Sequence, residues 1–392
     1  MQKSLFSKIP EDAETILKDF DLLIQKKFNL NSKHRNQLLK NIQELSHQLT
    51  DERSTRRIGY MNNAPFLSAY CYYFMWWNLY RLVNLFSTMD SEAFAHLKDN
   101  SVIIDFGAGP LTVAIALYLA RPELRKIKLT CYCVDISQNA LAVGEELYLS
   151  VVSQINTLTN ENSDSEFCEP WIIKKIKGTI GTEIKQKADL ITSANMFNEI
   201  YWNSPKTLEE HVKTISTTLL SYTDQSVKNT ILLIEPGIPR GSRFISLFRD
   251  NLIRKKYTIV SPCTHHEKCC MDGKKGGKWC HFILPTSKAP KKLLTISDKA
   301  NLSKDRASLS FVVATSQYIK ETPKISPMRI VSDSIRLPFG IGKYACSDKG
   351  LTLIIDNKNT LHFGDCIEAF VSKDLPKDKK TKALIINKFT KI

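Results

Sequence analysis

The chain has 392 residues, of which 43% are hydrophobic and 24% are charged, and its formal net charge is +15. These values exclude a disordered or fibrous protein, and the length predicts about two or three folded domains. The sequence lacks an apolar signal segment and an apolar run of the roughly 20 residues that a membrane-spanning helix needs, so we expect a cytoplasmic protein with no membrane partner.

Basic residues are concentrated in two parts of the chain. Residues 251–306 contain thirteen Lys and Arg against four Asp and Glu, and the last 22 residues contain seven Lys against two Asp. Lysine can serve solubility alone, but clustered basic residues are typical of proteins that bind a polyanion, since neutralising phosphates releases counterions. The distribution therefore favours a nucleic acid as partner.

The first part of the chain, residues 1–95, is predicted to be helical. Pro10 begins an acidic first turn, and Asn31 with Ser32 can cap a second helix. A later helical segment carries four aromatic residues on one face: Tyr70, Tyr73, Trp77 and Tyr80. A stripe at this spacing can stack on bases, but it more often packs into a core, which is our interpretation here.

From Val102 onwards, short apolar runs alternate with helical segments, which predicts an α/β domain with a mostly parallel sheet over residues 96–322. Seven strands are expected: Val102–Phe106, Leu129–Asp135, Trp171–Lys177, Ala188–Ala194, Asn229–Glu235, Tyr257–Ser261 and Ala307–Ala314. Residues 153–167, rich in Asn, Ser and Thr, are predicted to form a surface connection. Residues 262–305 interrupt the alternation and are predicted to form a Cys-rich insertion.

The helical pattern ends near Pro323. Residues 323–370 consist of short alternating runs separated by the turn sequences SDKG and DNKN, which predicts a small separate β module. Residues 371–392 are predicted to follow it as a basic tail.

The sequence VIIDFGAGPLT, residues 102–112, is predicted to be a strand, a glycine turn and the start of a helix. Gly107 and Gly109 let the backbone approach a ligand, and Asp105 closes the strand with a carboxylate. Asp135 ends the second strand, where it can accept hydrogen bonds from ribose hydroxyls. A dinucleotide site would require glycine in place of Thr112, so the motif favours S-adenosylmethionine over NAD.

The remaining parts of the predicted cofactor site are Ser193 and Glu235, at the ends of the fourth and fifth strands. The segment TSANMFNEI, where amino-methyltransferases usually carry an Asn/Asp-Pro-Pro-aromatic motif, offers Asn195 and Glu199 as further pocket residues. It contains no recognisable base for proton removal, so the catalytic residues are unknown at this stage.

Four cysteines and three histidines lie within residues 263–281. The spacing of Cys263, Cys269 and Cys280 is too irregular for the paired knuckles of most structural zinc sites, and it suits an iron–sulfur cluster at least as well. Cys270 adjoins Cys269, and neighbouring residues rarely point at one centre. A fourth ligand is therefore expected from downstream, with Cys346 as first candidate and Cys366 as second.

The other Cys and His residues are given structural or supporting roles. Four cysteines are expected to be ordinary small residues in apolar or loop surroundings: Cys71, Cys131, Cys133 and Cys168. Three histidines are expected to face RNA or to support ligands rather than to bind metal: His265, His266 and His281.

Several motifs together resemble one family, the methyltransferase-like proteins of small-ribosomal-subunit assembly, found in mitochondria and with bacterial relatives. The motifs are DFGAGPLT at 105–112, IEPGIPRGSRFISLFRDNL at 234–252, SPCTHHEKC at 261–269, WCHF at 279–282 and KYACSDKG at 343–350. One departure is Leu111, which stands where the family usually has glycine.

The resemblance implies a class I methyltransferase fold with a Rossmann-like seven-stranded sheet, an S-adenosylmethionine site and binding to small-subunit rRNA, with no DNA partner expected. It also implies a [4Fe-4S] cluster held by Cys263, Cys269, Cys280 and Cys346. Whether the protein methylates RNA stays open. The alternative is a catalytically inactive RNA-binding assembly factor stabilised by zinc.

Overall fold

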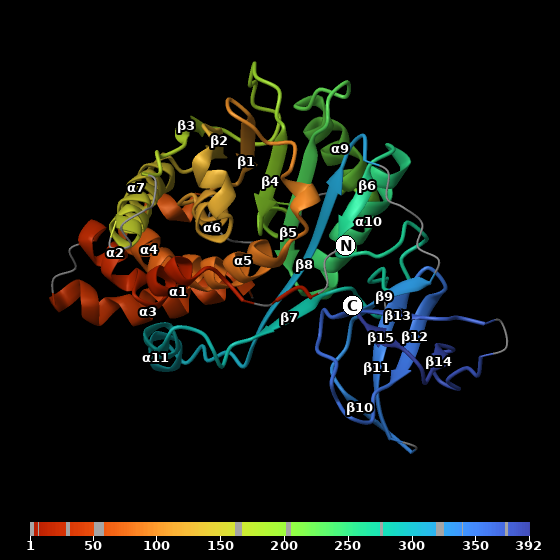
Figure 1. Cartoon of the computed structure of the whole chain (residues 1–392). Helices are drawn as coiled ribbons and strands as arrows, with labels where there is room; N and C mark the ends of the chain where they lie inside the picture. The colour runs from red at the N-terminus through yellow and green to blue at the C-terminus, as the bar shows by residue number, and fades with distance from the viewer. Residues whose placement is uncertain are drawn as a thin grey trace.

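The computed structural model describes residues 4–6, 8–28, 32–50, 59–160, 167–200, 205–274, 277–318, 325–338, 340–372 and 375–392. Two β-sheets organise these residues (Figure 1). The N-terminal helices pack with the larger sheet, and the C-terminal strands form a smaller sheet beside it.

The larger sheet has eight strands among the described residues. They are β1 Val102–Phe106, β2 Thr130–Asp135, β3 Ile172–Lys177, β4 Leu190–Ala194, β5 Thr230–Pro236, β6 Thr258–Ser261, β7 Phe282–Pro285 and β8 Arg306–Thr315. The strand order is β3-β2-β1-β4-β5-β8-β6, and β7 pairs with β8. Strands β1 to β5 are mutually parallel, whereas β8 runs antiparallel to β5, β6 and β7.

All seven predicted strands form, and their bounds differ from the prediction by at most two residues. Strand β7 was not predicted, because its four residues are too short a run to stand out within the Cys-rich segment. It extends the antiparallel side of the sheet, so the predicted insertion 262–305 is partly built into the larger sheet.

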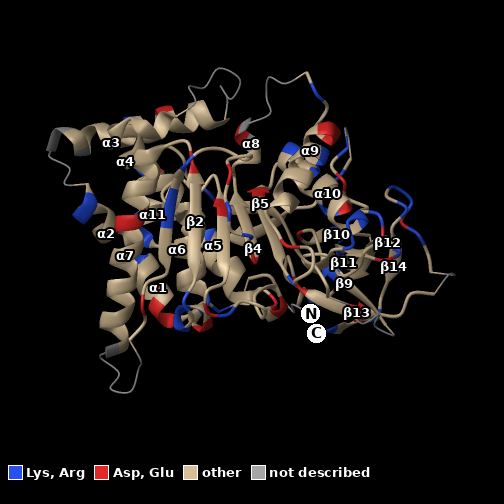
Figure 2. Cartoon of the chain, turned by 90° about the horizontal axis from the view of Figure 1, so that it is seen from above, with Lys and Arg blue, Asp and Glu red and all other residues tan. Residues whose placement is uncertain are grey.

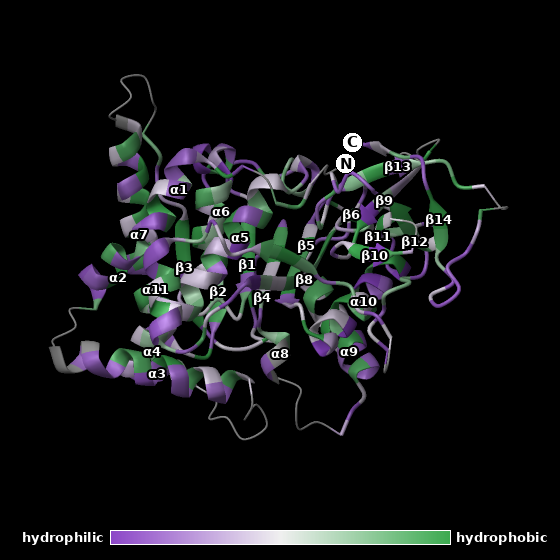
Figure 3. Cartoon of the chain, turned by 90° about the horizontal axis from the view of Figure 1, so that it is seen from below, coloured by the Kyte–Doolittle hydropathy of each residue, from purple (hydrophilic) through white to green (hydrophobic). Residues whose placement is uncertain are grey.

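Helices cover both faces of this sheet. Because successive strand residues point to opposite faces, Ile103 packs into the cluster with α5, α6 and α7, while Ile104 packs into the cluster with α9 and α10. Figure 3 shows hydrophobic strands between helices that are hydrophilic on their outer sides. The helices are α1 Glu11–Lys18, α2 Phe20–Lys27, α3 Ser32–Thr50, α4 Ala64–Ala69, α5 Trp76–Thr88, α6 Thr112–Ala120, α7 Gln138–Asn160, α8 Phe197–Ile200, α9 Leu208–Ser221, α10 Pro239–Arg254 and α11 Lys291–Lys299.

One helix extends further than predicted, and some residues of the helical prediction are not described. Helix α7 continues to Asn160, through part of the stretch 153–167 that its composition predicted as a surface connection, because Val151, Val152 and Ile155 are buried against the core. Residues 161–166 and Asn31, a predicted cap, lie outside the described residues.

The aromatic stripe belongs to the core, as predicted. Tyr73, Trp77 and Tyr80 are buried, whereas Tyr70 is half-buried. Their polar atoms find partners around α11: Tyr73 Oη donates to the Leu302 carbonyl at 2.9 Å, and Trp77 Nε1 donates to Ser297 Oγ at 3.0 Å. Residues Tyr70–Met75 form one π-helical turn between α4 and α5.

The smaller sheet is the predicted β module. Its strands are β9 Ser326–Ile330, β10 Ile335–Leu337, β11 Gly340–Ser347, β12 Gly350–Ile355, β13 Cys366–Ala369, β14 Leu384–Ile386 and β15 Thr390–Lys391. The order is β14-β12-β11-β9-β13-β15, and β10 pairs with β11. Strands β14 and β15 come from residues 371–392, so the segment that we treated as a basic tail folds back onto the module.

Both chain ends lie where the two sheets meet (Figure 1). Thr88 Oγ1 on α5 donates to the Leu5 carbonyl, and a Cβ on Gly364 would meet Leu5 Cβ at 3.0 Å. The Ile392 N–H donates to the Cys366 carbonyl at 3.1 Å. The first described residues therefore pack against the last module.

A search of the described helices finds none that is long and apolar enough to cross a membrane.

Gly144 allows α7 to approach the turn that follows β1. A Cβ at this position would overlap the Pro110 carbonyl carbon and lie 2.7 Å from Leu111 Cδ1. We expect Gly144→Ala to lower the free energy of unfolding by about 1–3 kcal/mol, although alanine favours helix, because the overlap outweighs helix propensity. Urea unfolding measures this, with Ser153→Ala on the exposed side of α7 as control. Equal stabilities of the two variants would contradict the close packing.

Candidate functional site

The turn between β1 and α6 has the backbone shape of a ligand-binding loop. Gly107 and Gly109 adopt φ angles of 69° and 51°, and Leu111, at the N-cap of α6, adopts φ 57° and ψ 35°. This left-handed conformation favours glycine, because a side chain strains the backbone there. Leu111 adopts this strained conformation, and its side chain is fully buried.

Asp135 holds this turn from the neighbouring strand. Its Oδ2 accepts from the Gly109 N–H at 2.9 Å, and its Oδ1 accepts from the Ser137 N–H at 2.8 Å. Burial raises the pKa of Asp135, although these backbone hydrogen bonds lower it. The carboxylate retains a further acceptor position, so Asp135 can bind a ligand hydroxyl while it shapes the turn.

Buried polar atoms gather at the carboxyl ends of β1 and β4. Within the described residues, three of them have no hydrogen-bond partner: Asp105 Oδ2, Ser193 Oγ and Asn195 Oδ1. Ser193 lies opposite Phe106 in the β1–β4 register, next to the pair of Asp105 and Thr192. Buried polar groups are normally satisfied, so this edge of the sheet has the character of a site for a polar ligand.

Asp105 also has a strongly shifted pKa. Burial raises the pKa of Asp105 to about 7, although the hydrogen bond that Thr192 Oγ1 donates to Oδ1 at 2.7 Å lowers it. The charge of Asp135 adds to the increase. Asp105 is therefore partly protonated near neutral pH and can donate as well as accept a hydrogen bond.

The N-terminal region covers the same edge. Ser137 Oγ donates to Asn62 Oδ1 at 2.9 Å, and Asn139 Nδ2 donates to the Asn62 carbonyl at 3.2 Å. Burial is the main cause that raises the pKa of Tyr70, in the π-helical turn. The nearby charges of Glu199 and Asp135 raise it further. Glu199, one of the predicted pocket residues, is thus placed near Tyr70.

Two other residues shape this edge. Glu235 is buried at the end of β5, where its Oε1 accepts from the Phe197 N–H at 2.9 Å and so holds the start of α8. Met196 packs over the turn, since a Cβ on Gly107 would lie 2.8 Å from its side chain. A ligand against Gly107 shares this space with a flexible thioether side chain.

The structure brings the downstream cysteine to the Cys-rich segment. Cys346 lies on β11 of the smaller sheet, and its Sγ is 3.5 Å from Cys270 Sγ. The contact with Cys270 and burial are the main causes that raise the pKa of Cys346. Cys263 and Cys269 are near enough to raise it further. Burial is the main cause that raises the pKa of Cys280, and the nearby thiols of Cys269, Cys263 and Cys270 raise it further. Five thiols thus converge from two sheets.

Cys270 departs from our expectation, since it joins this group although it is adjacent to Cys269. Its hydrogen bond with Cys346 lowers the pKa of Cys270. Burial, and then the neighbouring Cys263, raise the pKa of Cys269 to about 12. Cys366 is fully buried on β13, where it lies beside Arg329 in the strand register. Among the described residues, no group of three or more His, Cys, Asp or Glu is arranged to hold a single metal ion.

Two buried arginines, which the sequence analysis missed, flank the thiols. Arg249 on α10 donates from Nε to Cys263 Sγ at 3.2 Å and from Nη2 to the carbonyls of His265 and Glu267. Burial lowers the pKa of Arg249, but the nearby Cys263 and Cys269 outweigh it and raise the pKa overall. The apolar stripe of α10, with Phe248 and Leu252 beside Arg249, is a signal that could have revealed a buried arginine.

Arg329 is the second buried arginine. Its Nε donates to the Pro262 carbonyl at 3.1 Å, and its Nη1 donates to the Gly364 carbonyl at 3.0 Å. Burial lowers the pKa of Arg329, while the thiols of Cys366 and Cys263 raise it. Arg329 therefore ties the smaller sheet to the residue just before Cys263.

The histidines take separate positions. His265 Nε2 lies 3.3 Å from Cys346 Sγ, whereas His266 Nε2 accepts from the Ile259 N–H at 2.9 Å. His281 stacks on Trp279 with ring centroids 5.4 Å apart. Of the four cysteines expected to be ordinary small residues, Cys71, Cys131 and Cys133 are buried, and Cys168 is half-buried.

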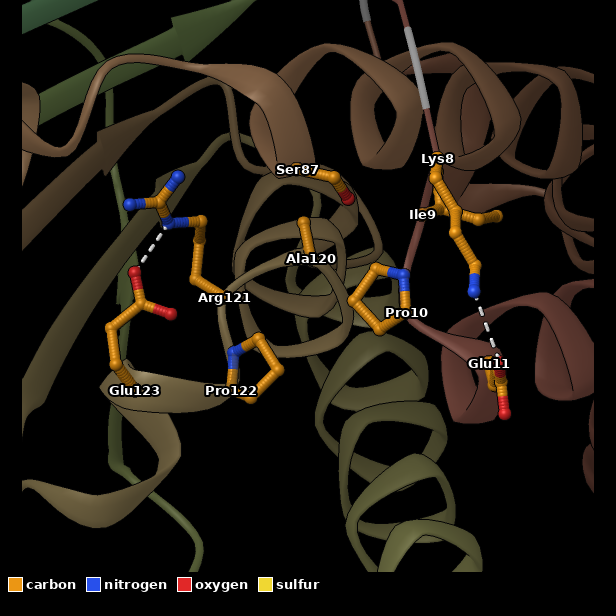
Figure 4. Close-up of a pocket in the computed structure, with 9 residues that line it drawn as sticks. All are labelled: Lys8, Ile9, Pro10, Glu11, Ser87, Ala120, Arg121, Pro122 and Glu123. Carbon is orange, nitrogen blue, oxygen red and sulfur yellow. Dashed lines mark hydrogen bonds and ion pairs between the residues drawn. The ribbon is translucent and has the colours of Figure 1, made fainter.

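A cavity of about 470 Å³ lies away from both groups, between the N-terminal segment and the end of α6. Figure 4 shows that its charged lining residues are already paired: Lys8 with Glu11 and Arg121 with Glu123. It contains none of the residues predicted for the site.

The strand order, with an antiparallel β8 between β5 and β6, defines a class I methyltransferase fold. Residues 88–338 match the family model described as mitochondrial small ribosomal subunit Rsm22, which spans more than half of the chain. The protein belongs to the Rsm22 family.

The solved structures that the chain matches resemble it only distantly. A putative class I S-adenosylmethionine-dependent methyltransferase from Listeria monocytogenes is 12% identical, with 80% of this chain and 90% of that chain covered and a TM-score of 0.34. A precorrin-6y C5,15-methyltransferase from Geobacter metallireducens is 11% identical, with 56% and 81% covered and a TM-score of 0.30. An rRNA methylase from Streptococcus thermophilus is 10% identical, with 44% and 84% covered and a TM-score of 0.24. No curated protein matches the chain.

The raised pKa of Asp105 predicts a pH dependence of stability. Between about pH 4 and 7 the folded state holds a proton that the unfolded state has released, so Asp105 makes folding less favourable as the pH rises through this window. Asp105→Asn should therefore gain stability relative to wild type between pH 4.5 and 8, on the order of 2–4 kcal/mol.

Urea unfolding at several pH values measures this difference. Thr192→Val, which removes the hydrogen bond that lowers the pKa of Asp105, should move the window to higher pH. A constant difference between Asp105→Asn and wild type at all pH values would show that Asp105 does not titrate in this range.

Proposed function

We propose that this protein binds the rRNA of the small ribosomal subunit during assembly, through a methyltransferase-fold domain that binds S-adenosylmethionine and a [4Fe-4S] cluster. Cys263, Cys269, Cys280 and Cys346 would hold the cluster. The observation that carries this proposal is the convergence of thiols from two sheets beside two buried arginines. The family match supports the ribosomal role, and it ends at residue 338, before Cys346.

The thiol group suits a cluster in its chemistry. Thiolates bind iron–sulfur centres, and a cluster with bound thiolates carries net negative charge. Arg249 and Arg329 supply buried positive charge beside the group. Bound metal would then join the smaller sheet to the larger one, so that metal binding contributes to folding of the C-terminal half.

The edge around Asp105 suits S-adenosylmethionine. It offers a glycine turn, the Asp135 carboxylate on the adjacent strand and unpaired buried polar atoms on Ser193 and Asn195. Asp135 would hold the ribose hydroxyls, and the turn would let the ligand approach the backbone. When bound, this cofactor supplies an activated methyl group.

The two proposed sites are separate. Cys263 follows β6, whereas Asp105 ends β1, and four strand steps of about 4.8 Å separate these strands in the sheet. The distance of roughly 20 Å keeps the cofactor out of direct contact with the thiols. Each site can therefore be disrupted without removing ligands from the other.

Cys346→Ser tests the metal proposal, because this ligand comes from the smaller sheet. Protein purified without oxygen should contain about four iron atoms and matching sulfide per chain, and the variant should lose most of both. Cys168→Ser, outside the thiol group, is the matched control. Zinc in place of iron would contradict the cluster and support the zinc-stabilised alternative, and unchanged metal content in Cys346→Ser would reject this ligand.

Asp135→Ala tests the cofactor proposal. The loss of its carboxylate should weaken S-adenosylmethionine binding at least about tenfold, since a charged hydrogen-bond acceptor is lost, and should leave metal content unchanged. Isothermal titration calorimetry measures the affinity, and Asp99→Ala on the surface before β1 is the control. An unaltered affinity in the folded variant would reject the ribose assignment.

Methyl transfer is tested separately. Labelled S-adenosylmethionine is incubated with the purified protein and immature small subunits. Label in the rRNA would establish an rRNA methyltransferase, whereas cofactor and rRNA binding without label would assign the cofactor site a structural role.

A further inference from the structure

A groove lies between the Cys-rich segment and the smaller sheet. Its volume is about 260 Å³, and residues from β7, β8, β11 and the segments around them line it. This volume is just below the range of drug-sized ligand pockets, about 300–1,000 Å³, so it suits a flat group of the size of one nucleobase.

Aromatic rings form one wall of the groove. Trp279 and His281 stack with an interplanar angle of 25°, and His281 is 5.7 Å from the Phe363 ring. Trp279 Nε1 donates to the Gly237 carbonyl at 3.0 Å, which holds the indole in place. The rings are therefore positioned before any ligand arrives, as a stacking surface requires.

Two cationic side chains, Lys278 and Arg306, line the groove. Lys278 Nζ sits 3.5 Å from the centroid of the Tyr344 ring, and Arg306 pairs with Asp333 at 2.6 Å. Both members of the latter pair are more than half exposed, so the pair is weak and Arg306 can also contact a phosphate. Figure 2 shows further Lys and Arg residues on the loops around the smaller sheet.

The groove wall is built between two of the proposed cluster ligands. Asp272 and Trp279 form an antiparallel bridge, and the Cys280 N–H donates to the Met271 carbonyl at 3.0 Å. The segment that carries Lys278 and Trp279 is thus joined at both ends to the thiol group. This connection gives the basic, Cys-rich segment a role in positioning the groove.

We propose that this groove binds an unpaired base of single-stranded RNA, with the base stacked against Trp279 and His281 and with Lys278 and Arg306 at the flanking phosphates. This assignment rests on the proposed function, since it names the part of the RNA that one surface recognises. Aromatic stacking with basic residues beside it is the usual chemistry of single-strand recognition, and it tolerates any base.

Crosslinking and affinity test the proposal. A single-stranded oligoribonucleotide with 4-thiouridine, bound to the full metal-loaded protein, should crosslink on irradiation to Trp279, His281, Tyr344 or Phe363, as mass spectrometry can locate. Trp279→Leu combined with Tyr344→Leu should weaken binding of this RNA at least about tenfold. Phe370→Leu, an aromatic residue that is 79% exposed outside the groove, is the matched control and should bind as wild type does.

Lys278→Gln provides a second variant that leaves the aromatic rings in place. It should weaken binding about two- to fivefold and reduce the salt dependence of the affinity, since one phosphate contact is lost. Metal content and thermal unfolding establish that each variant is folded. Wild-type affinity in both groove variants, or crosslinks confined to other surfaces, would overturn the assignment.

A structured small-subunit rRNA fragment separates this inference from the proposed function. If the wild-type protein binds neither RNA, the proposed function fails and the groove assignment with it. If it binds the rRNA fragment while the groove variants bind the single strand unchanged, the groove assignment alone fails.

Discussion

The structure depends on five thiols that meet between two sheets. Cys263, Cys269, Cys270 and Cys280 follow one another in the chain, and Cys346 reaches them from β11. Thiols this close cannot all lose their protons without a compensating positive charge, because like charges repel strongly where water is excluded. Two buried arginines supply part of that charge, and a metal centre would supply the rest.

This arrangement explains how two otherwise separate modules form one molecule. Arg329 bonds from β9 to the Pro262 carbonyl, so the smaller sheet is joined to the end of β6 directly beside Cys263. Leu5 reinforces the junction, since it lies against Gly364 of the smaller module and its carbonyl accepts from Thr88 on α5. Disruption of the thiol group should therefore affect the orientation of the smaller sheet and the groove beside it more than the edge of the larger sheet around Asp105.

The edge of the larger sheet around Asp105 follows a different physical rule. Parallel strands end together, so Asp105, Asp135 and Ser193 come to one edge by the order of the strands. These three residues could be predicted from the sequence because each ends or nearly ends an apolar run. The left-handed backbone of Leu111 agrees with the prediction of a glycine at this position. The coverage of this edge by Asn62, Met196 and Tyr70 depends on long-range packing and left no local pattern.

The sequence by itself determined the seven strands, the aromatic core stripe, the β module and the glycine turn, since each follows from local hydrophobic period or turn chemistry. The tertiary structure alone decided three other features. It placed β14 and β15 in the module, it joined Cys270 to the thiol group, and it buried Arg249 and Arg329 beside the thiols. These features depend on which distant segments meet in space, and no periodicity along one segment encodes its distant neighbours.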